Sequence, residues 1–226
     1  MPFGASRNHM VDRAQDRRTL AKEQPNKITK WPRTERRQQR IRRVLERRQP
    51  DLTIVLENVH DPHNVSAVLR SCDAVGVLAV HTIYSIESRP QVAFARTISA
   101  SAAKWIEIEH HETVNACYDR LRSRGFTVLA ATLSDGSSLL HEIDLTRPVA
   151  LVFGNEMRGL SEEAVNQADG AIEIPMRGMI ESLNISVACG VALFEAARQR
   201  SERGDYDRAK LSEAQLAELT NDWLRR

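Results

Sequence analysis

The sequence predicts an α/β fold with a mostly parallel sheet flanked by helices. From residue 51 onward, short apolar runs typical of buried strands alternate with segments of helical periodicity. Strands that are separated by helices usually pair in parallel. A chain of 226 residues with 42% hydrophobic residues is also long enough to bury the core of one large domain.

The elements are predicted in order along the chain. Residues 1–33 show little apolar periodicity and are expected to be a basic, mobile arm, and Thr34 can cap a helix over 34–50 that stops at Pro50. Strands are expected at 52–59, 77–83, 105–109, 126–132, 148–153 and 171–176, and helices at 64–75, 112–124, from about Ser161, and at 183–200.

A last helix is expected within residues 201–226. Ser212 and Gln215 have the spacing of a capping box at its start. Its apolar stripe is expected to dock onto the body of the protein or onto a second subunit, and it consists of Leu216, Leu219, Trp223 and Leu224.

Charge is distributed unevenly. Residues 1–50 hold 15 Lys and Arg against 5 Asp and Glu, whereas the remaining residues hold 17 against 25. A basic segment on a mildly acidic body indicates a polyanionic partner such as nucleic acid, and a solvated tail is the alternative. The helix over 34–50 has a narrow apolar stripe, so its other faces are predicted to contact phosphates through Arg36, Arg37, Arg40, Arg43 and Arg47.

Several classes of protein are disfavoured. No apolar run is long enough to cross a bilayer, and the Arg-rich start does not resemble a secretory signal. Three widely spaced cysteines without a CxxC pair fit a reducing cytoplasm, which is the expected location. No GxGxxG, P-loop, GxSxG or HExxH motif is present. The histidine pairs His60/His63 and His110/His111 lack a third ligand at useful spacing, so no metal site is predicted.

Residues 57–77 are the first of three segments that carry candidate site residues. Asn64 is a natural N-cap for the helix, and Arg70 lies off its buried face among small side chains. Arg70 is therefore either an ordinary surface arginine or a ligand-binding group. The predicted buried face consists of Val65, Val68, Leu69, Cys72 and Val75.

The other two segments each follow a strand. In 151–164, Gly154 and Gly159 surround Glu156, which is typical of a tight binding loop, although an ordinary turn is the alternative. In 174–200, the polar stretch 181–184 interrupts apolar sequence, which indicates a helix start, a ligand site or both. In the helix that follows, Val187, Val191 and Phe194 have the spacing of core residues.

Taken together and in this order, the three segments resemble the motifs of the SPOUT methyltransferases, and more closely those of the TrmH branch of RNA ribose 2′-O-methyltransferases. The matching patterns are N-x5-R-x5-G (Asn64, Arg70, Gly76), LVFGNE-x2-G-L-S and IPM-x-G-x3-SLN-x-SVA. The resemblance covers roughly residues 40–200. It is strongest to members that methylate the D-loop guanosine at position 18 of tRNA.

The resemblance implies a catalytic domain over 51–200 with a deep C-terminal trefoil knot at about 148–200, a homodimer, and S-adenosylmethionine as cofactor. It implies that Arg70 orients the ribose 2′-hydroxyl and stabilises the developing alkoxide. Asn64 and Glu156 are expected to hold Arg70 and the loops in place by hydrogen bonds. Ser182 and Asn184 match positions implicated in catalysis or in support of the site. By the same correspondence the cofactor site is lined by Ala131, Thr132, Gly154, Ile174, Met176, Gly178 and Leu183.

Three alternatives remain open on the sequence alone. The first alternative is a ribosomal RNA 2′-O-methyltransferase of the same family. Such enzymes often carry a separate N-terminal RNA-binding domain, and the N-terminal segment here is too short and too polar to form one. A catalytically silent RNA-binding protein has no need of the complete set of site residues. A DNA-binding protein lacks support because no helix-turn-helix or zinc-finger pattern is present.

Overall fold

The computed structural model describes residues 33–86, 104–134 and 136–226. The chain divides into two units, Met1–Arg36 and Arg37–Arg226, and the boundary falls inside helix α1 (Arg33–Leu45). The predicted N-terminal arm over residues 1–33 lies outside the described residues except for Arg33.

The second unit is built on a seven-stranded sheet, and neighbouring strands among the described residues all pair in parallel. The strand order is β3-β2-β1-β6-β4-β7-β5. This arrangement confirms the predicted α/β fold with a parallel sheet. The strands are β1 (Leu52–Glu57), β2 (Ala79–Ile83), β3 (Glu107–His111), β4 (Thr127–Ala131), β5 (Ser138–Leu139), β6 (Val149–Phe153) and β7 (Gly170–Glu173).

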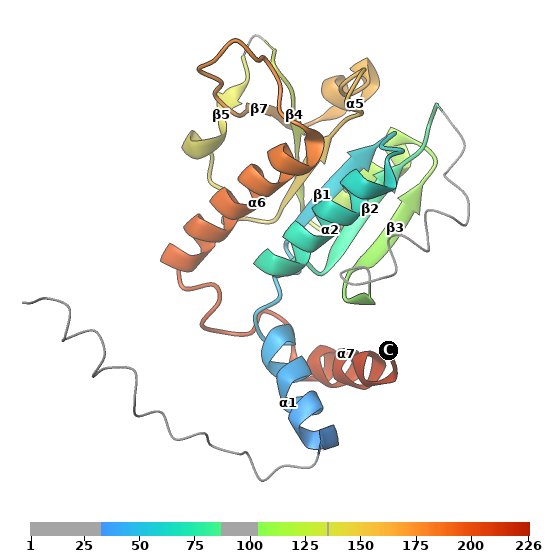
Figure 1. The fold of residues 1–226 in the computed structure, drawn as a ribbon, viewed down its shortest axis with the longest axis vertical. Helices are drawn as coiled ribbons and strands as arrows, with labels where there is room; N and C mark the ends of the chain where they lie inside the picture. Colours follow the sequence, from blue (N-terminus) through green and yellow to red (C-terminus); the bar gives the residue numbers. More distant parts are fainter. Residues whose placement is uncertain (1–32, 87–103, 135) are drawn as a thin grey trace, which may run out of the picture. The chain divides into compact units, whose positions relative to one another are not determined.

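Helices cover both faces of the sheet, and Figure 1 shows α2 and α6 side by side on one face. The predicted elements are all found, although the helix predicted to stop at Pro50 ends at Leu45, more than a turn earlier. β5 and the 3-10 turn η2 (Leu140–Glu142) were not predicted, because such short elements carry no periodic pattern. The helices after α1 are α2 (Pro62–Val75), α4 (Val114–Ser123), α5 (Glu162–Gln167), α6 (Ile185–Glu202) and α7 (Glu213–Arg225).

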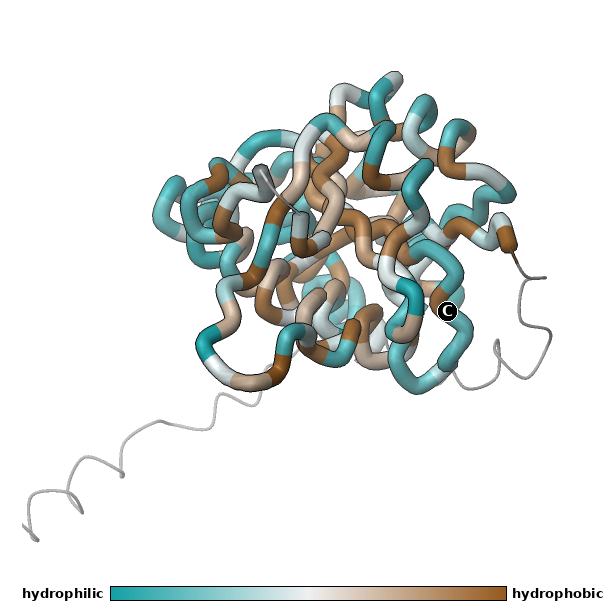
Figure 2. Tube along the Cα trace, turned by 90° about the horizontal axis from the view of Figure 1, so that it is seen from above, coloured by the Kyte–Doolittle hydropathy of each residue, from teal (hydrophilic) through white to brown (hydrophobic). Residues whose placement is uncertain are grey.

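The core around the sheet consists of two apolar layers, one on each side, and a third apolar cluster lies between α1 and α7. Successive residues of β1 serve different layers: Ile54 packs with residues of α2 and α6, and Val55 packs with residues of α4. A central strand that is covered on both faces reads as a continuous apolar run, as residues 52–56 do. Figure 2 shows the same distribution, with apolar chain in the interior and hydrophilic turns outside.

Helix α7 docks onto the body, as its apolar stripe predicted. Leu216 and Trp223 pack with Ile41 and Leu45 of α1, and the Ser212–Gln215 capping box is present. Arg48 connects the apolar cluster of α1 and α7 to α2. Its buried guanidinium lies 5.0 Å from the centroid of the Trp223 ring and 2.5 Å from an Asp73 carboxylate oxygen. Arg48 therefore stabilises the fold and is not available to bind RNA.

The predicted core role of three α6 residues is wrong. Val187, Val191 and Phe194 are exposed in this chain. Apolar residues occur all around α6, so periodicity alone could not select the face that packs against the sheet. The face that is buried carries Ile185, Cys189, Ala192, Leu193 and Ala196.

The predicted N-cap of α2 also needs correction. Asp61 is the cap, and its carboxylate accepts a hydrogen bond of 2.8 Å from the backbone N–H of His63. Pro62 occupies the first helical position, where its missing N–H costs nothing. Asn64 therefore lies in the first turn, and its side chain is available for other contacts. The predicted buried face of α2 is confirmed in full.

Candidate functional site

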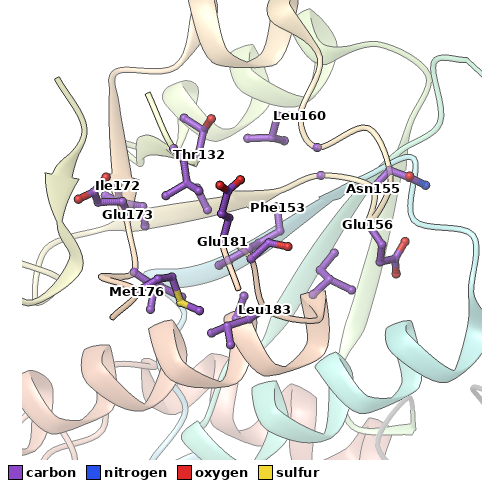
Figure 3. A pocket seen from close by; sticks show the side chains of 18 residues that line it. Thr132, Phe153, Asn155, Glu156, Leu160, Ile172, Glu173, Met176, Glu181 and Leu183 are labelled. Carbon is purple, nitrogen blue, oxygen red and sulfur yellow. The ribbon is translucent and has the colours of Figure 1, made fainter. Parts of the chain in front are cut away.

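A cavity of about 350 Å³ lies at the carboxyl ends of β4, β6 and β7 and at the start of α6 (Figure 3). This is the edge of a parallel sheet at which ligands generally bind. The structure brings six of the seven predicted cofactor-binding residues to its wall, and Gly178 is not among the lining residues. The six are Ala131, Thr132, Gly154, Ile174, Met176 and Leu183.

The cavity wall combines apolar side chains with carboxylates. Glu156, Glu173 and Glu181 line it, and the described lining residues include no lysine, arginine or histidine. In Figure 3, Glu181 lies between Thr132 and Leu183. The wall therefore has a negative character that suits a cationic ligand. Glu173 was not singled out from the sequence, and Glu181 was noted only as part of the polar stretch 181–184, because a glutamate beside a strand or loop is common on any surface.

The loop after β6 owes its shape to two glycines. Backbone hydrogen bonds join Asn155 and Gly159 in both directions, at 3.0 and 2.8 Å. A Cβ atom on Gly154 would lie 2.2 Å from the carbonyl of Gly159, so only glycine fits there. Gly159 has a φ of +68°, which lies in the left-handed region that glycine tolerates. The predicted tight loop is thus present, and its two glycines have different physical roles.

The end of β1 holds this loop in place, a role the sequence did not reveal. The buried carboxylate of Glu57 accepts hydrogen bonds from the backbone N–H and the hydroxyl of Ser161, at 2.9 and 2.6 Å. The Asn155 amide donates to the carbonyl of Asn58 at 2.9 Å. The only available signal was a polar Glu-Asn pair directly after an apolar strand.

Three of the predicted catalytic residues form a hydrogen-bonded chain. The Asn64 amide donates to Glu156 Oε1 at 2.6 Å, and the Asn184 amide donates to Asn64 Oδ1 at 3.2 Å. Asn184 is also the N-cap of α6, since its Oδ1 accepts from the backbone N–H of Ser186 at 2.9 Å. The polar stretch is therefore a helix start, as predicted, and Ser182 within it lines the cavity.

Arg70 stands apart from this chain. Its side chain is exposed on α2, and it has no hydrogen-bond or ion-pair partner among the residues that the structure describes. The expected contact of Asn64 and Glu156 with Arg70 is not seen, because those two side chains bond to each other. The helix itself is positioned by close packing on α6, where Ser71 faces Gly190. The guanidinium of Arg70 is therefore available to an external ligand.

The predicted phosphate-binding arginines are all exposed, whereas two of their neighbours are not available. Arg42 pairs with Glu46 and Glu213, at 3.0 and 2.8 Å, and Arg48 is buried. The exposed arginines are Arg36, Arg37, Arg40, Arg43 and Arg47.

Among the described residues, none of the helices combines the length and apolarity that a membrane crossing needs.

Comparison with known proteins agrees with this arrangement. A tRNA (guanosine(18)-2′-O)-methyltransferase of Thermus thermophilus is 50% identical over 194 residues, which cover 86% of this chain and 98% of the relative. The crystal structure of the Aquifex aeolicus TrmH/SpoU tRNA modifying enzyme has a TM-score of 0.77 and 41% identity, and covers 85% of this chain and 96% of that one.

A more distant structure is the AdoMet-bound rRNA methyltransferase from Sinorhizobium meliloti. It has a TM-score of 0.58 and 30% identity, and the match covers 70% of this chain and 59% of that chain. Residues 51–194 match the SpoU rRNA Methylase family, and that range contains the cavity, the hydrogen-bonded chain and Arg70. The chain belongs to this family.

Proposed function

We propose that this chain methylates the ribose 2′-hydroxyl of guanosine 18 in the D-loop of tRNA, with S-adenosylmethionine as the methyl donor, in the cytoplasm. The observation that carries the proposal is the acidic, partly apolar cavity, in a chain whose exposed Arg70 has no partner among the described residues. The cavity suits a cationic donor, and the arginine suits the phosphate of a polyanionic acceptor.

The cavity fits the proposed donor on chemical grounds. Its apolar side chains, among them Phe153, Leu160 and Ile172, offer a surface for a flat base. Its three glutamates favour a ligand that carries positive charge and disfavour nucleoside phosphates. When bound, S-adenosylmethionine supplies a methyl carbon activated by a sulfonium. The residues proposed to hold it are the six lining residues that the resemblance implied, and Gly178 lies in the loop that follows β7.

Arg70 is proposed to bind a phosphate of the target nucleotide and to orient the ribose 2′-hydroxyl. Its guanidinium stays protonated near neutral pH, so it is not a simple general base. A planar fork of N–H donors can hold a phosphate and stabilise the developing alkoxide at once. The 2′-hydroxyl proton is proposed to pass to that phosphate, either directly or by a relay in which the guanidinium gives one proton to the phosphate as it takes one from the hydroxyl.

Asn64, Glu156 and Asn184 are proposed as positioning residues. Their hydrogen bonds connect the first turn of α2, the loop after β6 and the start of α6. The loop after β6 and the start of α6 line the cavity, and Asn64 bonds to both, so these hydrogen bonds are proposed to control the alignment of the reacting atoms. Ser182 is proposed to contact the ligand from the cavity wall.

Transfer RNA is favoured over ribosomal RNA by the degree of identity. This chain is 50% identical to the tRNA methyltransferase relative and 30% identical to the rRNA methyltransferase structure. The exposed arginines of α1 are proposed to bind the tRNA backbone. The organisation proposed is an N-terminal arm over 1–33, the arginine-rich helix over 34–50, a catalytic domain over 51–200 and a C-terminal helix within 201–226.

The catalytic domain is proposed to contain a trefoil knot at about 148–200. The strand order supports this proposal, because β4 lies between β6 and β7 although it precedes both in the chain. The loops after β6 and β7 also meet at one cavity.

A homodimer is proposed through the exposed face of α6. Val187, Val191 and Phe194 form an apolar stripe there, and Phe194 is 58% exposed. Such a stripe beside a ligand site is typical of an interaction surface. Phe194→Asp should reduce the solution mass from dimer to monomer in light scattering, whereas Val44→Asp on α1 should not. A wild-type monomer at all concentrations would contradict the proposal.

The test of the reaction is methyl transfer from labelled S-adenosylmethionine to an unmodified tRNA transcript, followed by nuclease mapping. We expect 2′-O-methylguanosine at position 18, lost in Arg70→Ala and poorly restored in Arg70→Lys, which keeps the charge without the fork. Arg147→Ala is the control, since this arginine is exposed at the amino end of β6.

The outcomes separate the alternatives. Transfer to ribosomal RNA alone would keep the chemistry and change the substrate. Cofactor binding without transfer to either RNA would indicate a silent RNA-binding protein. Full turnover by Arg70→Ala would remove the proposed role of the guanidinium.

A further inference from the structure

A second cluster of reactive side chains lies away from the cavity, on the face of the sheet that α4 covers. His81 of β2 and His111 of β3 are on the same face, because the register pairs Ile83 with His111 and side chains alternate along a strand. Cys117 comes from the first half of α4 and packs into the same apolar layer. None of these three residues lines the cavity of the proposed methyltransferase site.

The three side chains converge closely. His81 Nδ1 and His111 Nε2 are 2.9 Å apart, and the rings are stacked with centroids at 5.2 Å. One ligand atom from each of His81, His111 and Cys117 lies within 4.8 Å of the other two. His110 contacts the opposite face of the sheet, where its Nδ1 is 2.6 Å from the Thr82 hydroxyl.

We propose that His81, His111 and Cys117 form a binding site for Zn²⁺. Two imidazole nitrogens and a thiolate are a ligand set that Zn²⁺ binds, with water in the fourth position. In tetrahedral zinc the ligand atoms are about 3.3–3.8 Å apart, as follows from Zn–N and Zn–S bonds of about 2.0–2.3 Å. The ligand atoms lie 2.9 to 4.8 Å apart at most, so reaching that geometry needs changes of up to about 1.5 Å in the distances between them.

The protonation states are consistent with such a site. Burial lowers the pKa of His81 to about 4, so its ring is neutral at pH 7 and keeps a lone pair. Burial raises the pKa of Cys117 to about 12, so the metal-free site holds a thiol. Binding leaves each ring with one proton, on the nitrogen that does not bind the metal, and releases the thiol proton to solvent. About one proton is therefore released per ion.

The surrounding charges do not oppose the site strongly. Glu109 is the register partner of His81 and forms ion pairs with Arg124 at 2.7 Å and Arg120 at 3.6 Å. The carboxylate offsets part of the positive charge of the two arginines, and a thiolate adds a second negative charge. His111 is partly exposed, which gives an ion a route to the buried His81 and Cys117.

The sequence predicted no metal site because its neighbouring histidines cannot share one. His110 and His111 are adjacent on a strand, so their side chains project to opposite faces of the sheet. The three ligands proposed here come from three elements that only the parallel pairing and the packing of α4 bring together.

The test uses the full-length protein after removal of metal with a chelator. Co²⁺ serves as the spectroscopic probe, and we expect one equivalent to produce a thiolate-to-cobalt charge-transfer band that Zn²⁺ then abolishes. Calorimetry of Zn²⁺ binding in buffers of different ionisation enthalpy should show release of about one proton. Zn²⁺ should also raise the melting temperature.

Matched variants make the result decisive. Cys117→Ser should lose the charge-transfer band, and His111→Gln, at a partly exposed position, should weaken Zn²⁺ binding at least tenfold. Cys189→Ser and His63→Gln, which change a buried cysteine and a histidine outside the cluster, should behave as wild type. Absence of the band in folded wild-type protein, or an unchanged band in Cys117→Ser, would overturn the proposal.

Discussion

The side chains of Asn64 and Glu156 are joined by an amide–carboxylate hydrogen bond of 2.6 Å across 92 positions of the chain. The same Asn64 side chain accepts a hydrogen bond from Asn184. One asparagine thus connects the first turn of α2 to the loop after β6 and to the N-cap of α6, and the last two segments line the cavity. Because Asp61 caps α2, Asn64 is not needed for that purpose.

Replacing Asn64 by alanine should lower kcat/KM for tRNA methylation by about 10- to 100-fold, since a hydrogen bond to a charged group contributes about 1.5–3 kcal/mol. Asn64→Asp should be at least as harmful, because it places two carboxylates side by side. Melting temperatures should change little, as the residue is partly exposed at a helix end. Asn115→Ala is the matched control, since Asn115 donates to Glu163 and neither residue lines the cavity. Equal activity of Asn64→Ala and Asn115→Ala would exclude the positioning role.

Gly154→Ala should abolish or strongly weaken cofactor binding. The new methyl carbon would lie 2.2 Å from the Gly159 carbonyl, so the loop must move away from the cavity that it lines. We expect a dissociation constant for S-adenosylmethionine at least tenfold higher in calorimetry. Gly178→Ala provides the comparison, because a Cβ atom there meets no atom within 4 Å. The prediction fails if the two variants bind the cofactor alike.

Neutralising the exposed arginines of α1 should reduce the salt dependence of tRNA binding. In the triple variant Arg40→Gln/Arg43→Gln/Arg47→Gln, the slope of log K for tRNA against log salt concentration should become less steep by about 0.7–0.9 for each lost phosphate contact, the values for single strands and duplex DNA. Cofactor affinity should stay unchanged, because none of these residues lines the cavity. Arg147→Gln removes one exposed charge elsewhere and should leave the slope as it is. An unchanged slope in the triple variant would place the RNA on another surface.

Acid should destabilise the segment between α6 and α7 through Asp205. Hydrogen bonds from Arg203 and then Lys210 lower the pKa of Asp205 to about 2. A carboxyl group whose folded pKa is depressed stabilises the fold above its ordinary pKa of 3.8, and that contribution is lost as the pH falls toward 2. We expect a loss on the order of 1 kcal/mol, after allowance for solvent screening.

Urea unfolding between pH 5 and pH 2 measures this loss. Asp205→Asn should be less stable at pH 5 and show a flatter pH dependence than wild type. A variant with the same pH profile as wild type would show that other carboxylates are responsible, Asp51 beside Arg200 and Lys210 being the first to examine.

Local sequence determined the elements of this protein and the identity of its motifs. Apolar runs and helical periodicity predicted the strands and helices, because each pattern depends on neighbours within one or two turns. Capping residues such as Ser212 predicted their own helix start for the same reason. The positions of Gly154 and Glu156 after a strand also indicated the edge of the sheet at which the cavity lies.

Only the tertiary structure decided which of these residues meet. The sheet order brings Asn64 to Glu156 and Asn184, and it brings His81 to His111 and Cys117. It also leaves Val187, Val191 and Phe194 exposed although their spacing is that of a buried face. These outcomes depend on contacts between elements far apart in the chain, for which local periodicity carries no information. The sequence therefore determined which groups are available for chemistry, and the packing of α2, α4 and α6 on one parallel sheet determined how they combine.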